Sequence, residues 1–460
     1  MIPQPAIAIF DLGKTNKKLF LFDEEYNIVY EKSAKFIETE DEDGFPCDNI
    51  DSLQISVLDS LREIFRTDEF DVRSINFSTY GASFVYVDGK GFPLTPLYNY
   101  LKPYPALLQE KFYQTYGGQE KLSLETASPV LGSLNSGLQI YRIKYEQPQV
   151  FEKIKYALHL PQYMSYLLTG RAYSDLTSIG CHTRLWNFRQ NNYHEWVAKE
   201  NLNSKLAPII AGSSASQADF ADKEFLVGPG LHDSSAALIP YLVNFKEPFA
   251  LISTGTWCIS LNPFNNLPLT EKELQQDTLC YLTYEGRAVK ASRLFSGYEH
   301  EQQVERISTH FNQLNSKYKT VAFDTTIVEL LKSRKQAEEK TEGKTLLMKQ
   351  SFFEKRNLAG FNNYEEAYHQ LILDLVSQQY TSTELVLKGS GVKRIFVDGG
   401  FSNNSIYMNL LASMFSGKEI FAASIAQSTA LGAALAIHHS WNKKPCPNDL
   451  IQLKYYASGE

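Results

Sequence analysis

The chain has 460 residues, of which 43% are hydrophobic and 21% charged. These fractions are close to the averages of soluble globular proteins and exclude the disordered and fibrous classes. The length exceeds what one hydrophobic core usually serves and predicts two domains. A formal net charge of −7 argues against a nucleic-acid partner, because a protein that binds the phosphate backbone needs a clustered basic face.

The cysteines and the apolar runs bear on the compartment. The five cysteines are scattered and include no CxxC pair, which argues against a disulfide framework or a zinc site and favours a reducing compartment. The apolar run 6–10 lacks a basic leader. No stretch reaches the roughly 20 apolar residues that a membrane span needs. We therefore expect a cytoplasmic protein with no membrane partner.

Two strand hairpins of one kind are predicted, one in each half of the chain. The first has apolar runs at 6–10 and 19–22 with a polar turn between them. The second has runs at 249–253 and 257–261. The repetition indicates that the chain starts its fold twice.

Further strands and helices follow each hairpin. Strands are predicted at 74–79, 84–87 and 394–397, and helices at 148–168, 364–380 and 405–415. Glycine, proline and charged residues gather between 227 and 248, so we place a domain boundary near residue 245. These patterns predict an α/β protein with domains 1–245 and 246–460.

The first hairpin turn carries polar residues suited to phosphate. Asp11 ends an apolar run, and Gly13, Lys14, Thr15 and Lys18 follow it. Such a turn directs backbone N–H groups and cations at phosphate oxygens, while a carboxylate at a strand end suits Mg²⁺. The alternative interpretation is an ordinary polar turn.

Two further turns have the same character. Thr254, Gly255 and Thr256 form the second hairpin turn, where a glycine lets the backbone approach a ligand closely. Gly399 and Gly400 follow a strand and precede a helix, so a nucleotide could lie against bare backbone there. A plain βα turn is the alternative. If the halves are duplicated, the phosphate turns face each other across a cleft.

The adjacent pair His232 and Asp233 follows a glycine-rich turn and precedes small residues that start a helix. A carboxylate in this position acts either as a helix N-cap or as a general base. One His and one Asp at neighbouring positions do not make a hydrolytic zinc site, and the other histidines supply no companion spacing.

The ordered motifs resemble the FGGY family of carbohydrate kinases along nearly the whole chain. The resemblance lies in a phosphate hairpin, a Leu-Thr-Gly landmark, a Gly-x-His-Asp segment, a second phosphate motif and an adenosine motif. In this sequence they are Asp11, Gly13, Thr15 and Lys18; residues 167–170 with Asp175; Gly230, His232 and Asp233; residues 253–257; and Asp398, Gly399, Gly400, Ser402 and Asn403. The resemblance implies two ribonuclease-H-like, actin-type lobes with an interdomain cleft.

The resemblance also implies ATP and Mg²⁺ as cofactors, a sugar substrate, and Asp233 as the base. The substrate segment departs from the family pattern, because Tyr98 and Tyr100 stand where Trp and Asp are expected. Gly81 and Ala82 fall where the family has a His-Gly sugar contact. These departures favour a pocket like that of rhamnulose and fuculose kinases, built from Gly81, Ala82, Tyr100, His232 and Asp233.

We therefore predict transfer of a phosphoryl group from MgATP to a ketose, with L-rhamnulose, L-fuculose and pentuloses as candidates. An actin-type ATPase without a sugar substrate is one alternative, and a sugar-binding regulator that has lost catalysis is another. A homodimer is the default expectation for an oligomeric soluble protein.

Overall fold

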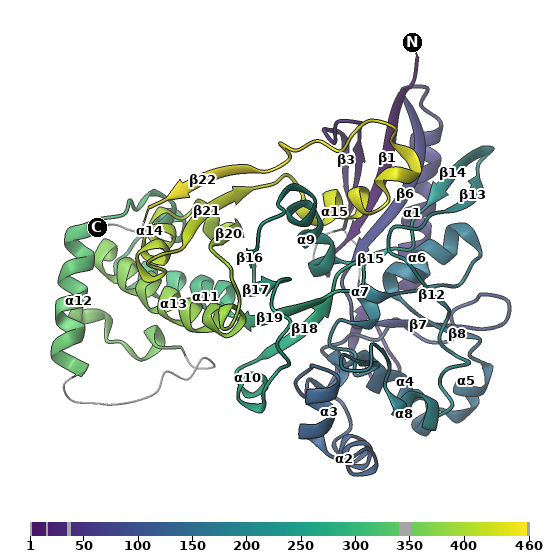
Figure 1. Cartoon of the computed structure of the whole chain (residues 1–460), viewed down its shortest axis with the longest axis horizontal. Helices are drawn as coiled ribbons and strands as arrows, with labels where there is room; N and C mark the ends of the chain where they lie inside the picture. The colour runs from purple at the N-terminus through teal and green to yellow at the C-terminus, as the bar shows by residue number, and fades with distance from the viewer. Residues whose placement is uncertain (1, 15–16, 35–37, 340–350, 458–460) are drawn as a thin grey trace.

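The computed structural model describes residues 2–14, 17–34, 38–339 and 351–457, and these form two lobes side by side (Figure 1). The N-terminal lobe is built on a mixed sheet. In spatial order its strands are β13 (Ser216–Phe220), β14 (Lys223–Val227), β6 (Phe70–Thr79), β1 (Gln4–Leu12), β2 (Lys17–Phe22) and β3 (Ile28–Ala34), with β15 (Leu231–His232) also paired to β6. Its long helices are α1 (Ile50–Phe65), α4 (Ser136–Glu146), α6 (Leu160–Thr169) and α9 (Asp233–Asn244).

The C-terminal lobe has a second mixed sheet. Its strands in spatial order are β18 (Thr278–Leu282), β19 (Ala288–Leu294), β17 (Cys258–Asn262), β16 (Phe249–Thr254), β20 (Arg394–Gly399), β21 (Glu419–Ser424) and β22 (Gln452–Tyr456). Its helices are α10 (Glu271–Gln275), α11 (Ser296–His310), α12 (Thr325–Glu339), α13 (Tyr364–Leu387) and α14 (Ser405–Met414). Two later helices, α15 (Ser428–Ala436) and α16 (His438–Trp441), pack against the N-terminal lobe.

Smaller elements complete the N-terminal lobe below its sheet. They are β4 (Glu38–Glu40), β5 (Pro46–Asp48), β7 (Phe84–Val87), α2 (Ala106–Thr115), α3 (Gln119–Glu125), α5 (Pro148–Lys153), β8 (Tyr156–His159), β9 (Ser174–Asp175), α7 (Leu176–Ile179), β10 (Trp186–Asn187), β11 (Asn192–Tyr193), α8 (Glu195–Lys199) and β12 (Ile209–Ile210).

The two sheets repeat one strand order, which confirms the duplicated, actin-like α/β architecture. The order β3-β2-β1-β6-β15 in the first sheet corresponds to β19-β17-β16-β20-β21 in the second. In each case an antiparallel meander is followed by parallel strands. Both predicted hairpins are therefore present, as β1–β2 and β16–β17.

Strand β1 lies between two helical layers. Residues 6–10 are all buried because α1 and α6 cover one face of the sheet and α9 and α15 cover the other. A strand covered on both faces reads as a continuous apolar run instead of an alternating one. This explains why the first hairpin was visible in the sequence.

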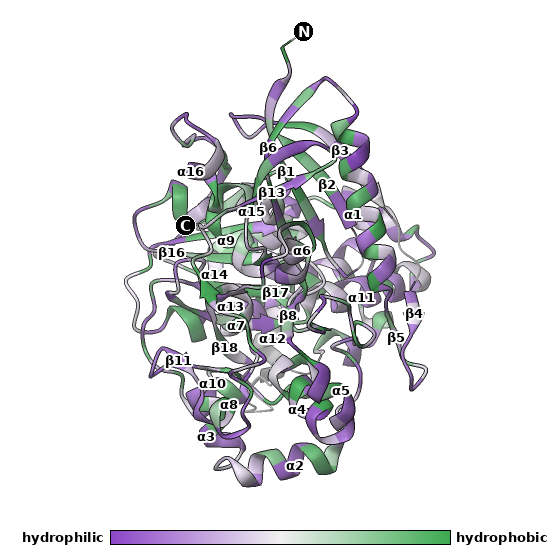
Figure 2. Ribbon diagram, turned by 90° about the vertical axis from the view of Figure 1, so that its right-hand side faces the viewer, coloured by the Kyte–Doolittle hydropathy of each residue, from purple (hydrophilic) through white to green (hydrophobic). Residues whose placement is uncertain are grey.

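Helix α1 shows how an amphipathic sequence finds its place. Asn49 caps it by accepting from the Ser52 N–H at 2.9 Å, and its buried residues recur at helical spacing towards the sheet. Figure 2 shows apolar and polar colours alternating along α1, with the sheet strands behind it mostly apolar.

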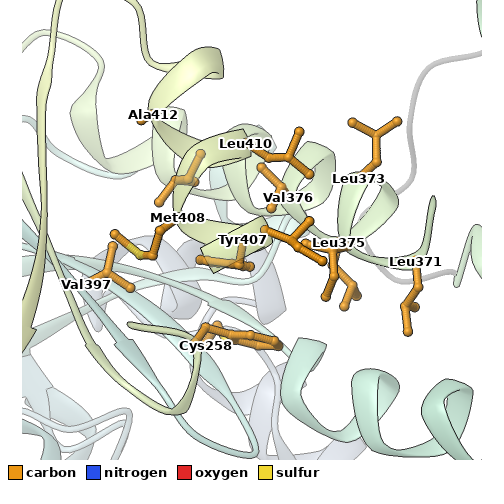
Figure 3. Packing of buried hydrophobic residues seen from close by; sticks show 14 of the residues in the cluster. Cys258, Leu371, Leu373, Leu375, Val376, Val397, Tyr407, Met408, Leu410 and Ala412 are labelled. Carbon is orange, nitrogen blue, oxygen red and sulfur yellow. The ribbon is translucent and has the colours of Figure 1, made fainter. Parts of the chain in front are cut away.

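The core of the C-terminal lobe lies between its sheet and helices α13 and α14. Leu371 and Leu375 of α13 pack with Tyr407 of α14 and Val397 of β20 in one buried cluster (Figure 3). Helix α13 begins after Asn363, which accepts from the Glu366 N–H at 2.8 Å. The helices predicted at 364–380 and 405–415 are thus confirmed, although α13 continues to Leu387.

The continuous helix predicted at 148–168 is wrong. The segment forms α5, then strand β8, then α6. Strand β8 pairs antiparallel with β7, from Phe84 opposite His159 to Val87 opposite Tyr156, and this long-range pairing overrides the local helical pattern. Pro161 sits in the first turn of α6, the position where a helix tolerates proline.

The lobes share a hydrophobic core through α15, which comes from the C-terminal part of the chain but packs on β1, β6 and α9. At the crossing of α15 and α9, a Cβ on Gly432 would lie only 1.9 Å from the Ala236 carbonyl oxygen. At the other end of the molecule the Cys280 N–H donates to the Ala127 oxygen at 2.9 Å. The lobes also meet between these two places, where the Ser235 hydroxyl donates to the Leu282 oxygen at 3.0 Å.

We expect Gly432→Ala to destabilise the protein by about 1–3 kcal/mol, because the added methyl group forces the two backbones apart. Alanine in an unhindered helix interior would instead stabilise by about 0.5–1 kcal/mol. Urea unfolding measures the change. Gly391→Ala is the control, since a Cβ there meets no atom within 4 Å. A Gly432→Ala variant as stable as the wild type would show that the helices do not meet this closely.

Candidate functional site

Strands β1, β6 and β15 run parallel and end at one edge of the N-terminal sheet. Their register places Asp11 of β1 beside Ser78 of β6, and His232 of β15 beside Thr79. Helix α9 begins at the next residue, Asp233. The carboxyl edge of parallel strands is where α/β folds bind ligands, and here it collects both predicted carboxylates.

Asp11 lies at the junction of the lobes. The Thr429 hydroxyl of α15 donates to Asp11 Oδ2 at 2.8 Å. Burial, and to a smaller extent the nearby Asp233 charge, raises the pKa of the Asp11 carboxyl from 3.8 to about 6 against the opposing hydrogen bond from Thr429. Two carboxylates therefore lie close enough to repel each other.

This arrangement fits a bound Mg²⁺. A divalent cation would relieve the repulsion between Asp11 and Asp233 and bring oxygen ligands that it prefers. Within the described ranges no group of three or more His, Cys, Asp or Glu side chains is arranged to hold a metal. Phosphate and water oxygens would therefore have to complete the coordination, which is how Mg²⁺ is commonly held beside nucleotides.

Asp233 is the first residue of α9 and remains accessible. Its Oδ1 accepts from the Ser234 N–H at 2.6 Å and lies 3.2 Å from His232 Nε2, while 31% of its side chain is exposed. Its charge also raises the pKa of the Tyr100 hydroxyl, second to burial. The N-cap position belongs to His232 and no side chain caps this helix, so of the two alternatives that the sequence left open the helix cap is wrong, whereas the carboxylate can be reached.

The predicted sugar-contact residues surround this carboxylate. The Tyr100 ring lies 5.7 Å from the ring of Tyr80. A Cβ on Gly81 would come within 2.7 Å of the His232 ring, and Ala82 has a positive φ of 66°. His232 itself is buried, which lowers the pKa of its imidazole and keeps it neutral.

The structure adds Asp48, which the sequence did not single out. This buried carboxylate accepts from Lys14 Nζ and Lys17 Nζ, both at 2.9 Å, and from the Tyr80 hydroxyl at 2.7 Å. Burial alone would raise the pKa of Asp48, but these hydrogen bonds hold it below its usual value. Asp48 thus joins the first phosphate turn to the loop that carries Gly81. No motif marks it, because its partners come from distant segments.

The cations of the first turn have protein partners. Lys14 Nζ also lies 3.0 Å from Glu38 Oε1, and Lys18 Nζ lies 2.8 Å from Glu31 Oε1. Glu38 and Glu31 are exposed, so exchanging them for phosphate oxygens would cost little. Gly13 lies at the end of β1, whereas Thr15 falls outside the described residues.

A pocket of about 480 Å³ lies in the C-terminal lobe between the second phosphate turn and the start of α14. Its lining is Thr254, Gly255, Gly297, His300, Tyr318, Lys319, Val321, Gly400, Phe401, Asn403, Asn404 and Ser405. The pocket contains four of the predicted nucleotide residues: Thr254, Gly255, Gly400 and Asn403. Thr256 and Gly399 adjoin it without lining it.

Thr254 holds the two turns of this pocket together. Its hydroxyl donates to the Asp398 oxygen at 2.5 Å and accepts from the Phe401 N–H at 3.0 Å. Gly399 has φ of 86° and lies against the Thr254 backbone, where a Cβ would be 1.9 Å from the Thr254 oxygen. Thr254 and Gly399 therefore fix the backbone of the two turns that form this pocket.

The far end of the pocket is aromatic. The His300 ring lies 5.0 Å from Tyr318 and 5.2 Å from Phe401. Burial lowers the pKa of His300 to about 4, so its imidazole is neutral at pH 7. Neutral aromatic walls suit a planar base. Sequence analysis missed His300 and Tyr318, which no local motif connects to the turns.

We expect Asp48→Asn to lower the free energy of unfolding by about 3 kcal/mol or more, because it removes the buried carboxylate that the buried Lys17 and the partly buried Lys14 both contact. Glu38→Gln is the matched control, since it removes the exposed partner of the same lysine and should cost about 1 kcal/mol at most. Urea unfolding of both variants compares them. Equal losses of unfolding free energy in the two variants would contradict the conclusion that Asp48 is the main partner of these lysines.

Asp11→Asn tests the raised pKa of Asp11 in metal-free buffer. Between pH 3.8 and about 6 the unfolded chain releases this proton while the folded protein keeps it, so the wild type loses stability as the pH rises through this window. We expect the variant to gain stability relative to wild type between pH 4 and pH 7, measured by urea unfolding. The exposed Asp219→Asn serves as control. If the difference in unfolding free energy between the variant and the wild type did not change with pH, the raised pKa of Asp11 would be contradicted.

Comparison with known protein families finds two matched domains, one in each half of the chain. Residues 6–218 match the FGGY family of carbohydrate kinases, N-terminal domain, and residues 246–445 match the carbohydrate kinase FGGY, C-terminal domain. A protein from Oceanobacillus iheyensis named rhamnulokinase is 23% identical over 288 residues, which are 59% of this chain and 58% of that relative. The match thus spans little more than half of the relative's length.

Solved structures share the fold. A carbohydrate kinase from Novosphingobium aromaticivorans has a TM-score of 0.78 and 22% identity, covering 99% of this chain and 94% of its own. A xylulose kinase from Lactobacillus acidophilus has a TM-score of 0.76 and 13% identity over the same shares. In the described part of the chain, no helix has the length and apolar character to cross a membrane. The matched domains confirm the resemblance seen in the motifs: the chain belongs to the FGGY family of carbohydrate kinases.

Proposed function

We propose that this protein transfers the γ-phosphoryl group of ATP to a hydroxyl group of a ketose. The observation that carries the proposal is the partly exposed carboxylate of Asp233, held beside Asp11 at the edge where the first phosphate turn begins. Phosphoryl transfer depends mainly on positioning and charge stabilisation, and the two carboxylates at this edge support the proposal.

Asp233 is the proposed base. Its contacts with Ser234 and His232 fix the carboxylate while leaving a third of it accessible to an acceptor hydroxyl. The proton of that hydroxyl would pass to Asp233 as the oxygen attacks the phosphorus in line with the leaving group. The neutral, buried imidazole of His232 lies against this carboxylate and helps to fix its position.

ATP is proposed to span the two lobes. Gly13, Lys14, Thr15 and Lys18 of the first turn, with Thr254, Gly255 and Thr256 of the second, would hold its phosphates. Gly399, Gly400 and Asn403 would lie along the adenosine, whose base fits the aromatic end of the pocket. Asp11 would hold Mg²⁺, which when bound neutralises the charge on the phosphates.

The sugar is proposed to lie among Gly81, Ala82, Tyr100, His232 and Asp233. L-Rhamnulose and L-fuculose are favoured, because Tyr100 replaces the acid of the common family pattern and the curated relative is a rhamnulokinase. A cytoplasmic location, a homodimer and a domain boundary near residue 245 remain predictions.

Asp233→Asn tests the base, because the amide keeps the shape and the helix contact but cannot take a proton. With the ketose that a coupled ADP-release panel identifies, we expect kcat to fall at least about a hundredfold with little change in the sugar KM. The exposed Asp219→Asn should leave kcat unchanged. Turnover within a few-fold of wild type would remove Asp233 from this role, and ADP release indifferent to every ketose would favour an ATPase instead.

A further inference from the structure

Three neighbouring aromatic rings form an exposed cluster in the C-terminal lobe. Trp257 is 42% exposed, Phe295 41% and Tyr298 43%. The ring centroids of Trp257 and Phe295 lie 4.5 Å apart, and those of Phe295 and Tyr298 lie 4.6 Å apart with an interplanar angle of 13°. We call these rings the aromatic platform. Contiguous exposed apolar surface of this kind marks binding sites more often than scattered residues do.

The platform lines a pocket of about 410 Å³ that also carries guanidinium, carboxylate and amide groups. Arg293 is only 8% exposed, binds Asp277 through two hydrogen bonds of 2.9 and 3.2 Å, and lies 5.3 Å from the Trp257 ring centre. The other polar lining residues are Gln276, Ser296, Glu299, Ser351, Glu354 and Gln378. An apolar wall facing hydrogen-bonding groups matches the C–H face and the hydroxyl groups of a carbohydrate.

The platform is fixed to the second phosphate turn. The Tyr298 N–H donates to the Thr256 oxygen at 3.2 Å, and the Gly255 N–H donates to the Trp257 oxygen at 2.9 Å. A Cβ on Gly297 would lie 1.8 Å from the Gly255 oxygen, so the two backbones are in direct contact. Turn and platform therefore move as one body.

Buried side chains connect the pocket with the neighbourhood of Asp233. After burial, the Arg293 guanidinium is the next cause that holds the pKa of the His182 imidazole well below its usual value, so these groups are close. The Tyr281 ring lies 6.1 Å from His182 and 5.7 Å from His232, and His232 adjoins Asp233. Arg293, Tyr281, His182 and His232 are all buried, so they form a packed layer between the platform and the proposed base.

We propose that the aromatic platform binds the acceptor carbohydrate, stacking on the C–H face of the part remote from the hydroxyl that is phosphorylated. This inference rests on the proposed function and adds a C-terminal wall to a sugar site otherwise built by the N-terminal lobe. Within the described residues the nucleotide pocket and this pocket share no lining residue, so the nucleotide base, which fits the first pocket, leaves the second one open to another ligand.

Tryptophan fluorescence reports on the platform without any turnover. The chain has four tryptophans, and Trp186, Trp196 and Trp441 are buried, so acrylamide quenching reports mainly on Trp257. We expect millimolar L-rhamnulose, L-fuculose or D-xylulose to reduce this quenching about twofold or more, because a ligand stacked on Trp257 would cover the exposed part of its ring. A non-hydrolysable ATP analogue without sugar should have little effect. Protection by the analogue alone, or by none of the ketoses, would overturn the proposal.

Kinetics of Phe295→Ala and Tyr298→Ala give a second measure. Both side chains are exposed, and we expect each variant to raise the KM for the ketose about tenfold, the worth of one aromatic contact, with the KM for ATP within about twofold. Phe92→Ala, which removes a 65% exposed ring in the other lobe, is the matched control. An active enzyme with unchanged ketose KM in both variants would refute the platform while leaving the proposed function intact, whereas a wild type inactive on all ketoses would refute the function itself.

Discussion

The site depends on keeping two carboxylates, those of Asp11 and Asp233, close together at one edge of a buried sheet. Parallel pairing of β1 and β15 with β6 brings Asp11 and the start of α9, which is Asp233, to this edge. Burial first, and then the Asp233 charge, raises the pKa of Asp11, so its ionised form is disfavoured when no cation is bound. A cation and a substrate hydroxyl are the groups that would turn this electrostatic cost into binding and catalysis.

The same edge connects the lobes. The hydrogen bond from Thr429 to Asp11 and the packing of α15 on α9 place a C-terminal helix in the core of the N-terminal lobe. The carboxylate proposed to hold the metal is thus bonded by a helix from the C-terminal part of the chain. Asp48 joins segments within one lobe, because it bonds both Lys14 of the first hairpin turn and Tyr80, which precedes Gly81.

In the C-terminal lobe, the second hairpin turn contacts both the candidate nucleotide pocket and the aromatic platform. Thr254 ties the second phosphate turn to the glycine turn that follows β20, and the aromatic end of that pocket suits a base. On the other side of the same turn lies the aromatic platform, held by the contact between Thr256 and Tyr298.

The sequence by itself determined the elements whose patterns are local. The paired hairpins were visible because central strands covered on both faces are continuously apolar, and Asp11 and Asp233 were found because each adjoins a strand or helix boundary. Only the tertiary structure decided the rest. Strand β8 exists because β7 pairs with it, and Asp48 and the aromatic platform gain their surroundings from segments far apart in the chain. Contacts between such distant segments leave no periodic or spaced signal in a single sequence, because burial and partner choice are properties of the folded chain.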